Sequence, residues 1–391
     1  MELRAHLQGC PGGPAKVRCV QRAHLAKNGE GYSLQRSVTI TESSMKQYQT
    51  TGAGAPLELV ESSTPEPVGS EVLLRTRACG VCHSDVHLHD GEFDLGGGRK
   101  LPVGQPGMTL GHEIMGEVIA LGPDAEGVAV GDLRVVYPWI GCGQCNTCRR
   151  GDEHLCLAPK VLGIHQGGGF GDHVVVPHSR YLFDFGAADP ALAATYACSG
   201  LTAYSALQRI GTLAPGDAVV IIGAGGLGQM AQQIGHAAFD LAPIVVDIDP
   251  DKLEAAKAQG AAAVVNSKDA DAAEQIKKLT DGGAVAALDF VGSELSANFG
   301  LSVLRKGGKL IVVGLYGGQL SFPLPFFPMM ARVIEGNYVG SLSDMDALMK
   351  LVREGAVKPI RIDRRPAADA ENILAELKAG RVQGRAVLVY D

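Results

Sequence analysis

The chain has few aromatic residues, little charge and no long apolar run. Aromatic side chains make up 5% of the 391 residues, with a single tryptophan, and charged side chains make up 20%. A membrane-spanning helix needs about 18 consecutive apolar residues, and the longest apolar candidate, 218–228, is interrupted by glycine. We therefore expect a soluble protein without a membrane-embedded part.

An excess of positive charge is also missing. The formal net charge is −7 at pH 7 and the pI is about 5.9, which excludes the broad basic surface that nucleic acid requires. The N-terminus lacks the apolar core of a secretory signal, so we expect a cytoplasmic protein. Disulfides are disfavoured there, and the nine cysteines are better interpreted as metal ligands.

Glycine, by contrast, is abundant. The chain has 52 glycines and is 46% hydrophobic, which is typical of a globular protein rich in tight turns. Its length exceeds what one hydrophobic core usually serves and favours two domains. Residues 1–44 are basic, poor in acids and without a periodic apolar face, so we expect a disordered N-terminal tail. The alternative is an upstream start codon, with the protein beginning at Met45.

The remaining chain divides by its pattern. Residues 45–199 carry short β-rich runs separated by turn residues, which predicts a mostly β domain; the clearest runs are 72–77, 114–121 and 172–176. Residues 200–340 alternate β-rich runs with helical stretches, which predicts an α/β fold with a doubly wound, six-stranded parallel Rossmann sheet. The six runs are 218–222, 243–247, 262–265, 284–289, 309–314 and 333–339. Residues 341–391 begin with a capped helix and end in a β run, so we expect them to return to the first domain.

A glycine-rich turn follows the first of these six runs. The sequence GAGGLG at 223–228 comes directly after the apolar run 218–222 and opens a helix, as a dinucleotide-binding turn does. Glycines let the pyrophosphate approach backbone N–H groups at a helix N-terminus. The next strand ends at Asp247, whose carboxylate can accept both ribose hydroxyls and repels a 2′-phosphate. The pattern predicts NAD rather than NADP.

Four cysteines lie within one short loop. Cys142, Cys145, Cys148 and Cys156 are spaced for a closed tetrahedral zinc site, which leaves no position for substrate and is therefore structural. An iron–sulfur cluster or free thiols are the alternatives, but the fixed ferredoxin spacing is missing.

Three further candidates are scattered along the chain. Cys82 lies in CGVCHSD, His112 in GHE, and Cys198 just before the Rossmann region. Taken alone, each is ordinary, because a buried cysteine usually behaves as a small apolar residue and a lone histidine usually packs in a core.

Together with the cysteine loop and the glycine turn, in this order, these residues closely resemble the medium-chain zinc-dependent alcohol dehydrogenase family across residues 46–391. The resemblance implies a GroES-like catalytic domain, two zinc ions per chain, and hydride transfer from a primary or secondary alcohol to NAD, giving an aldehyde or ketone, and the reverse. It also implies a homotetramer or homodimer formed through the Rossmann domains.

The resemblance assigns the catalytic zinc to Cys82, His112 and Cys198, with a fourth position open to substrate. It places Asp85 and Glu113 as carboxylates behind these ligands, and Asp85 would orient His112. Zinc would lower the pKa of the bound alcohol.

Proton removal falls, by the same resemblance, to a relay of Ser84 and His87. His89 is close in sequence but matches no family position, and we expect it to be a solvated loop histidine. Cys79 would complete a CxxC pair with Cys82, but we interpret it as a packed thiol.

The cofactor contacts that the resemblance implies are His83, Gly223, Gly225, Gly226, Leu227, Gly228, Asp247, Lys252, Val313 and Arg385. Lys252 matches the lysine on the adenosine side and Arg385 a pyrophosphate-binding arginine. His83 is a departure, because arginine is frequent at this position and a neutral imidazole attracts pyrophosphate less.

The substrate pocket is less well determined. Trp139 matches the aromatic residue that lines it, but core packing explains a lone tryptophan equally well. The loop between Cys82 and His112 is longer than in the liver-type members and contains 96–98, three glycines, so the shape of the entrance stays open.

Three other functions compete with this interpretation. A polyol or amino-alcohol dehydrogenase of the same superfamily would keep both zinc sites and NAD. A non-catalytic zinc- and NAD-binding sensor needs neither an open zinc position nor a proton relay. A zinc-independent quinone reductase relative should lack both cysteine sets.

Overall fold

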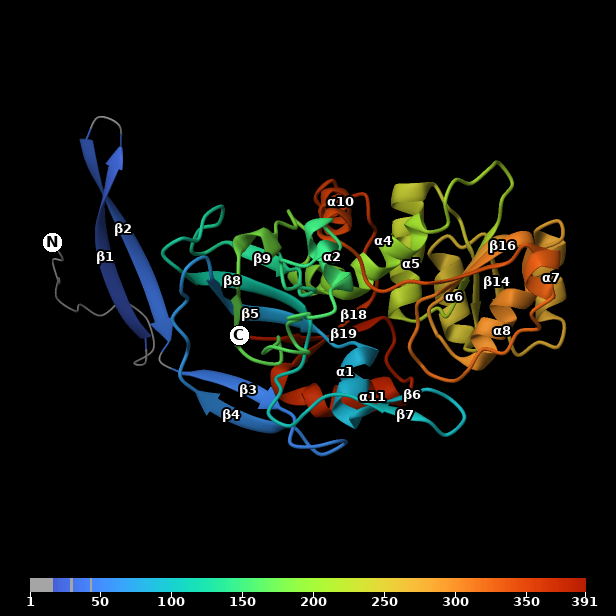
Figure 1. Cartoon of the computed structure of the whole chain (residues 1–391), viewed down its shortest axis with the longest axis horizontal. Helices are drawn as coiled ribbons and strands as arrows, with labels where there is room; N and C mark the ends of the chain where they lie inside the picture. The colour runs from blue at the N-terminus through green and yellow to red at the C-terminus, as the bar shows by residue number, and fades with distance from the viewer. Residues whose placement is uncertain (1–16, 29–30, 43) are drawn as a thin grey trace.

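The computed structural model of the chain describes residues 17–28, 31–42 and 44–391. Two sheets organise it, one in each half of the elongated body, and the helices α4 and α10 lie between them (Figure 1). The larger helices have the bounds α1 His83–Asp90, α3 Pro190–Thr195, α4 Leu201–Gln208, α5 Gly226–Phe239, α6 Pro250–Ala258, α7 Ala272–Leu279, α8 Glu294–Ser302, α10 Leu342–Arg353 and α11 Ala370–Lys378. Two short ones are α2 Asn146–Arg149 and α9 Phe326–Met330.

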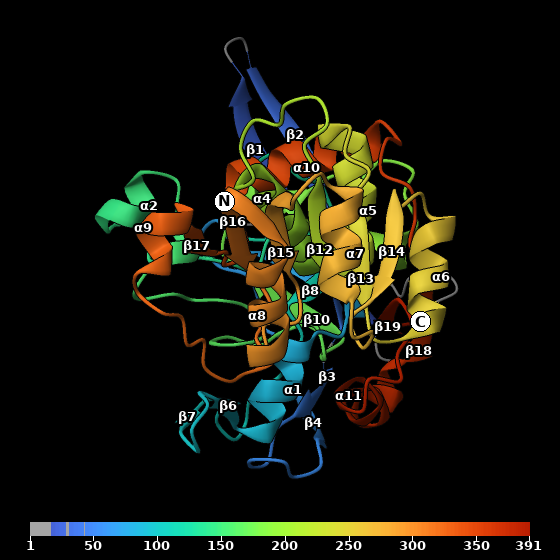
Figure 2. The ribbon, with the colours of Figure 1, turned by 90° about the vertical axis from the view of Figure 1, so that its right-hand side faces the viewer.

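The second half carries the predicted Rossmann sheet. Six parallel strands are ordered β14-β13-β12-β15-β16-β17, and α6, α7 and α8 run alongside them (Figure 2). The bounds are β12 Val219–Ile222, β13 Ile244–Asp247, β14 Ala263–Asn266, β15 Ala284–Asp289, β16 Leu304–Val312 and β17 Val333–Gly336. All four residues of β12 are buried, as expected of a central parallel strand covered on both faces.

Local signals position the crossover helices. In α6 the Asp249 side chain accepts a hydrogen bond from Asp251 N, and Pro250 occupies the first turn. Gly260, with φ of +96°, follows the helix in the left-handed conformation that glycine tolerates. Asp247, the last residue of β13, lies just before this helix, at the carboxyl edge of the sheet.

The first half is mostly β, as predicted. Its main sheet is ordered β11-β9-β8-β5-β19-β18, with β10 also paired to β5. The bounds are β5 Val72–Gly80, β8 Glu113–Leu121, β9 Leu133–Val136, β10 His173–Val176, β11 Leu182–Phe183, β18 Ile362–Pro366 and β19 Arg385–Val389. Two small hairpins lie outside it: β3 Met45–Gln49 with β4 Glu58–Ser62, and β6 Glu92–Asp94 with β7 Lys100–Pro102.

The end of the chain returns to this sheet. Ser341 caps the N-terminus of α10: its hydroxyl accepts from Asp344 N, while the Asp344 carboxylate accepts from Ser341 N. β19 then pairs antiparallel with β5, with Val387 opposite Gly80. This pairing brings Arg385, at the start of β19, beside the residues that follow β5.

The first two strands differ from the sequence expectation. β1 (Val17–Asn28) and β2 (Gly31–Glu42) form an antiparallel hairpin where we expected a disordered tail. The run Ser-Val-Thr-Ile-Thr at 37–41 alternates polar and β-branched residues, which suits a strand, and pairing satisfies the backbone hydrogen-bonding groups between the two strands. The part of the expected tail at 1–16 lies outside the described residues.

Among the described residues, no helix combines the length and the apolar character that crossing a membrane requires.

A buried hydrogen bond joins the two halves. Tyr137, which follows β9 and is 0% exposed, donates its hydroxyl to the carbonyl oxygen of Gly340 at 2.9 Å. Gly340 lies between β17, the last strand of the Rossmann sheet, and the start of α10. Burial raises the pKa of Tyr137 far above its usual value, so the hydroxyl keeps its proton.

We expect Tyr137→Phe to lower the free energy of unfolding by about 1–3 kcal/mol, because it leaves the buried Gly340 carbonyl unpaired. The midpoint of urea-induced unfolding measures this. Tyr316→Phe is the control, because Tyr316 is 70% exposed and its variant should unfold with the wild type. Equal midpoints for all three proteins would contradict the role of this bond.

Candidate functional site

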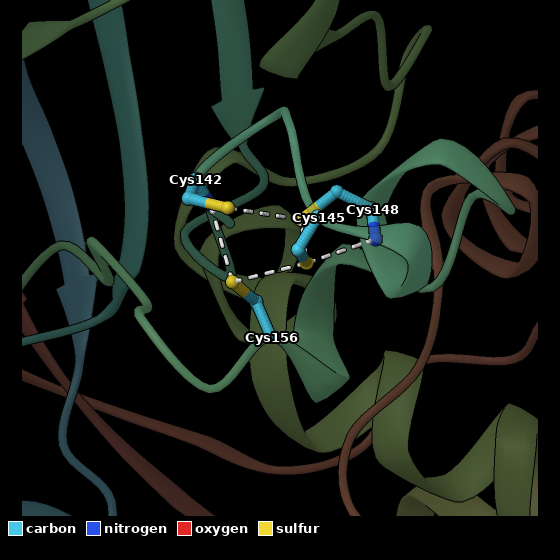
Figure 3. Close-up of side chains that lie close together, drawn as sticks. All are labelled: Cys142, Cys145, Cys148 and Cys156. Carbon is cyan, nitrogen blue, oxygen red and sulfur yellow. Dashed lines mark hydrogen bonds between the residues drawn. The ribbon is translucent and has the colours of Figure 1, made fainter.

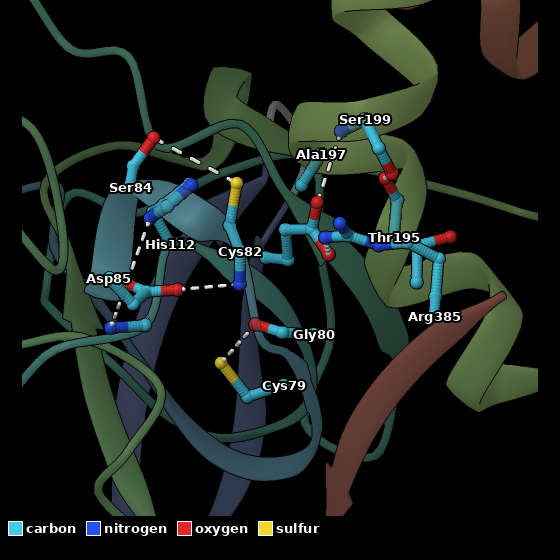
Figure 4. Close-up of polar contacts among 12 residues, drawn as sticks. Cys79, Gly80, Cys82, Ser84, Asp85, His112, Thr195, Ala197, Ser199 and Arg385 are labelled. Carbon is cyan, nitrogen blue, oxygen red and sulfur yellow. Dashed lines mark hydrogen bonds and ion pairs between the residues drawn. The ribbon is translucent and has the colours of Figure 1, made fainter. Parts of the chain in front are cut away.

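Cys82, His112 and Cys198 converge although they are far apart in sequence. Cys82 caps the start of α1 after β5, His112 immediately precedes β8, and Cys198 lies in the π-helical turn Tyr196–Gly200 between α3 and α4. Their ligand atoms all lie within 4.8 Å of one another. Figure 4 shows Cys82 and His112 close to Ala197 and Ser199, the two neighbours of Cys198 in the chain. Two thiols and one imidazole at this separation suit zinc with one open position.

Asp85 lies behind the histidine. Its Oδ1 is 3.2 Å from His112 Nδ1, and both side chains are fully buried. The same carboxylate accepts from Cys82 N at 2.8 Å and from Gly111 N at 3.2 Å. His112 Nε2 is buried without a hydrogen-bond partner, as expected of a nitrogen that binds a metal.

The first thiol is poised to ionise. A hydrogen bond from Cys198 and the nearby charges of His112 and Arg385 hold the pKa of Cys82 well below its usual value, against its burial. The thiolate is the form that binds a metal. The pKa of Cys198 is raised, because it donates to Cys82 and is itself buried.

Glu113, also placed behind the ligands by the sequence, is held by Arg385. Arg385 Nη2 lies 2.5 Å from Glu113 Oε2, and their side chains are 7% and 0% exposed. Glu113 Oε1 accepts from Ser199 N at 3.1 Å, next to Cys198. Sequence reasoning missed that Gly80 makes room for this carboxylate, because a Cβ there would lie 1.9 Å from Glu113 Oε2.

Trp139 lies against the same cluster. Its Nε1 donates to the Ala197 carbonyl at 3.0 Å, and its ring centroid is 5.3 Å from that of His112. Tyr338, just after β17, meets the other side of the indole with centroids 5.7 Å apart. No pattern in the sequence marked Tyr338. Trp139 is buried, as core packing predicts, and it borders the metal-ligand cluster; its place in the substrate pocket stays a prediction.

Ser84 and His87 both lie on α1. Ser84 Oγ is 3.8 Å from Cys82 Sγ, and the His87 ring stacks on Phe93 of β6 with centroids 4.5 Å apart. Burial lowers the pKa of His87 below its usual value, so the imidazole is neutral at pH 7.

His89 is not the solvated loop histidine that we expected. It is 8% exposed on α1, and its Nε2 lies 3.0 Å from the Ala55 carbonyl oxygen. Its position on α1 places it on the side that faces α11, where His89 Nε2 lies 3.5 Å from Glu371 Oε1. Cys79 is fully buried, as expected of a packed thiol.

The four-cysteine loop closes on itself. Cys142 Sγ lies 3.9 Å from Cys148 Sγ, and Cys145 Sγ lies 3.4 Å from Cys148 Sγ and 3.8 Å from Cys156 Sγ (Figure 3). Tetrahedral bonds of about 2.3 Å to zinc would separate sulfur atoms by about 3.8 Å, so the set fits the metal. Backbone N–H donors lower the pKa of Cys142 to about 6.

A buried carboxylate anchors this loop, and no sequence pattern predicted it. Glu153, which is 4% exposed, accepts from Tyr181 OH at 2.7 Å and from Gly141 N at 3.2 Å. Arg180 Nη2 lies 2.8 Å from its other oxygen.

The glycine turn has the predicted tight form. Gly223 adopts φ of +96°, and a Cβ on Gly228 would lie 1.8 Å from the Gly223 carbonyl oxygen, so α5 packs directly on the turn. Gly225, by contrast, faces open space, since a Cβ there meets nothing within 4 Å. This open side at the N-terminus of α5 fits a pyrophosphate.

Asp247 and Arg385, two of the residues predicted around the turn, lie near it. Asp247 Oδ2 accepts from Ala224 N at 2.7 Å, which ties the carboxylate to the turn. Lys252 lies 4.0 Å from Asp249. Arg385 also borders the turn, because a Cβ on Gly226 would lie 2.3 Å from its Cδ.

The remaining cofactor contacts that the resemblance implies lie in three different parts of the chain. Leu227 is partly buried in the first turn of α5, and Val313, 8% exposed, follows β16. His83 begins α1 and is exposed. The glycines at 96–98 connect β6 to β7 and touch the Rossmann half, since a Cβ on Gly96 would lie 2.8 Å from Gly318 C.

The comparisons with known proteins agree with this geometry. Residues 69–185 match the alcohol dehydrogenase GroES-like domain, and residues 226–354 match the zinc-binding dehydrogenase family. The chain is 40% identical over 345 residues to an NAD-dependent alcohol dehydrogenase of Sulfurisphaera tokodaii, covering 86% of this chain and 97% of that protein.

Two solved structures are similar. The alcohol dehydrogenase of Aeropyrum pernix has a TM-score of 0.78 and 31% identity, covering 88% of this chain and 100% of its own. The D-arabinose dehydrogenase of Sulfolobus solfataricus has a TM-score of 0.74 and 28% identity, covering 89% and 99%. The identity to the first relative, over most of both chains, and the two matched domains establish that this chain belongs to the medium-chain zinc-dependent alcohol dehydrogenase family.

Proposed function

We propose that the chain is an NAD-dependent, zinc-dependent alcohol dehydrogenase that interconverts a primary or secondary alcohol and its aldehyde or ketone. The observation that carries this is the convergence of Cys82, His112 and Cys198 within 4.8 Å, next to a dinucleotide-binding turn. Arg385 connects the two, since it pairs with Glu113 and borders Gly226. A metal ion with an open coordination position can bind an alcohol, and a dinucleotide bound beside it can accept the hydride.

The two cofactors divide the chemistry between them. Cys82, His112 and Cys198 would hold a zinc ion that would make the alcohol more acidic, and the glycine turn would hold NAD, which would supply the hydride acceptor. Cys142, Cys145, Cys148 and Cys156 would hold a second zinc ion, which would stabilise the loop. The negative charge of Asp247 favours NAD over NADP.

The protein residues move the proton and shape the pocket. Ser84, beside Cys82, takes the alcohol proton, and His87 accepts it at the outer end of the relay. Asp85 holds His112 in one orientation, because the ion pair fixes which ring nitrogen carries hydrogen. Trp139 and Tyr338 line the apolar side on which the carbon chain of the substrate lies.

A sugar or polyol is the second candidate substrate class. It is favoured by the likeness to the D-arabinose dehydrogenase, which is weaker in sequence than that to the alcohol dehydrogenases. The aromatic pair of Trp139 and Tyr338 favours an apolar chain instead, because it offers few polar groups to several hydroxyls.

A homodimer through the Rossmann halves is the proposed assembly. In the described part of the chain, β17 pairs only with β16, so its outer edge carries unpaired backbone groups. Exposed apolar residues lie on β17 and in the segment that precedes it: Leu320, Leu324, Phe326, Met329 and Val333. A second copy paired along β17 buries both the edge and these side chains.

We expect the wild type to contain two zinc ions per chain and to reduce NAD much faster than NADP with alcohols. Cys82→Ser should keep one zinc and lose turnover, because it removes a ligand from the open set only. Metal analysis together with NADH absorbance over a panel of primary, secondary, benzylic and polyhydric alcohols measures this.

Cys148→Ser is the matched variant in the closed set and should also lose one zinc, but with reduced stability as its main effect. Two zinc ions with tight NADH binding and no turnover on any alcohol or carbonyl would contradict the proposed activity. Turnover confined to polyhydric alcohols would support the second candidate.

Acid should slow alcohol oxidation through His87. An imidazole must be neutral to accept a proton, and burial lowers the pKa of His87 from its ordinary value of about 6.5. We therefore expect kcat to stay constant as the pH falls to about 6.5 and to decrease at a lower pH. His87→Gln should lower kcat about 100-fold at pH 7 and remove this acid limb. His89→Gln, on the same helix, is the control. An unchanged pH profile in His87→Gln would exclude His87 from the relay.

Val333→Lys should shift the protein from dimer or tetramer toward smaller species, because a charge on an edge strand opposes pairing. Light scattering after size exclusion measures the mass. Leu59→Lys, on β4 and 50% exposed, is the control and should leave the mass unchanged. A wild type that is monomeric at micromolar concentration would contradict the proposed assembly.

A further inference from the structure

Asp289, the last residue of β15, is a buried carboxylate that the proposed mechanism does not use. Its side chain is 0% exposed, and burial raises its pKa. The carboxylate accepts hydrogen bonds from neutral groups, namely two backbone N–H groups and one hydroxyl. Because a buried charge is costly, a carboxylate kept here implies a task that an apolar residue could not perform.

The carboxylate holds the segment that follows its own strand. Oδ1 accepts from Val291 N and from Gly292 N, each at 3.0 Å. Oδ2 accepts from the Ser296 hydroxyl at 2.8 Å, in the first turn of α8. A single side chain therefore fixes the turn between β15 and α8.

The backbone of Asp289 holds the neighbouring segment as well. Its carbonyl oxygen accepts from Val313 N at 2.9 Å and from Gly314 N at 3.0 Å, just after β16. The two segments lie in direct contact, because a Cβ on Gly292 would be 1.8 Å from the Gly314 carbonyl oxygen. Asp289 is thus the common anchor of 291–292 and 313–314.

The sheet order says which part of NAD these segments face. β12, with the glycine turn, has β13 on one side and β15 on the other. Asp247, at the end of β13, marks the side of the adenosine ribose. A dinucleotide extends across the carboxyl edge from one side of β12 to the other, so the β15 and β16 ends face the nicotinamide half.

We propose that Asp289 is a positioning residue that holds 291–292 and 313–314 in the conformation that receives the nicotinamide half of NAD. This role rests on the proposed function, since it requires NAD at the glycine turn. Loss of the carboxylate frees 291–292 directly and loosens 313–314 only through its contact with Gly292, because the bonds from Val313 N and Gly314 N to the Asp289 carbonyl remain. Binding must then order these segments, which lowers the affinity for the nicotinamide half of NAD and leaves that for the adenosine half unchanged.

Calorimetric titration of the zinc-loaded protein with NADH and with 5′-AMP tests this. Asp289→Ala should weaken NADH binding about tenfold or more and change 5′-AMP binding less than about twofold, because AMP occupies only the β13 side. Asp289→Asn should restore NADH binding to near the wild-type value, because its amide oxygen still accepts from Val291 N and Gly292 N.

Ser296→Ala is the matched control. It removes the hydroxyl contact of Asp289 and part of the cap of α8 but leaves both bonds to 291–292, so NADH binding should be unchanged. If Asp289→Ala does not fold, Asp289→Ser replaces it. The shorter serine hydroxyl can accept from only one of the two N–H groups. We therefore expect Asp289→Ser to lose NADH affinity and Asp289→Asn to keep it.

Equal weakening of NADH and 5′-AMP in Asp289→Ala or Asp289→Ser would overturn the role, since it indicates a general loss of the Rossmann half. Unchanged NADH binding would overturn it too. A wild type that binds neither ligand would overturn the proposed function and this role together, whereas a wild type that binds both keeps the two questions separate.

Discussion

The arrangement of the functional site depends on the buried ion pair between Glu113 and Arg385. Glu113 comes from the start of β8 and reaches Ser199 N beside Cys198, while Arg385 comes from β19 and reaches the glycine turn through Gly226. Two fully desolvated charges are favourable only when each finds its partner, and losing one leaves the other unpaired at high cost. The ion pair therefore links the segment that carries Cys198 to the dinucleotide turn.

Much of this could be predicted from the sequence, because the decisive signals are local. The spacing of Cys142, Cys145, Cys148 and Cys156 is a property of one loop, and a glycine turn between a strand and a helix is a property of about ten residues. The six parallel strands followed from their alternation with helices. By contrast, uniting Cys82, His112 and Cys198 required a family resemblance, because nothing local in the chain says that these three meet.

What the sequence missed depends on contacts between distant segments. Glu153, Tyr338 and Asp289 sit in ordinary stretches, and only the folded chain shows what each carboxylate or ring touches. His89 was misjudged for a similar reason, because the burial of a helical side chain depends on what packs against it, here α11. The hairpin of β1 and β2 was missed because we looked for a periodic apolar face, whereas strand pairing also depends on backbone hydrogen bonds that any residue can make.

The pairing of β19 with β5 orders events during synthesis. β5 leaves the ribosome early and β19 very late, so β5 waits with one edge open while the Rossmann half, whose strands are local neighbours, can already fold. Arg385 arrives only with that late strand. A nascent or truncated chain that ends before β19 therefore combines an incomplete first sheet with an unpaired buried Glu113, which makes such a fragment a natural substrate for chaperones and proteases.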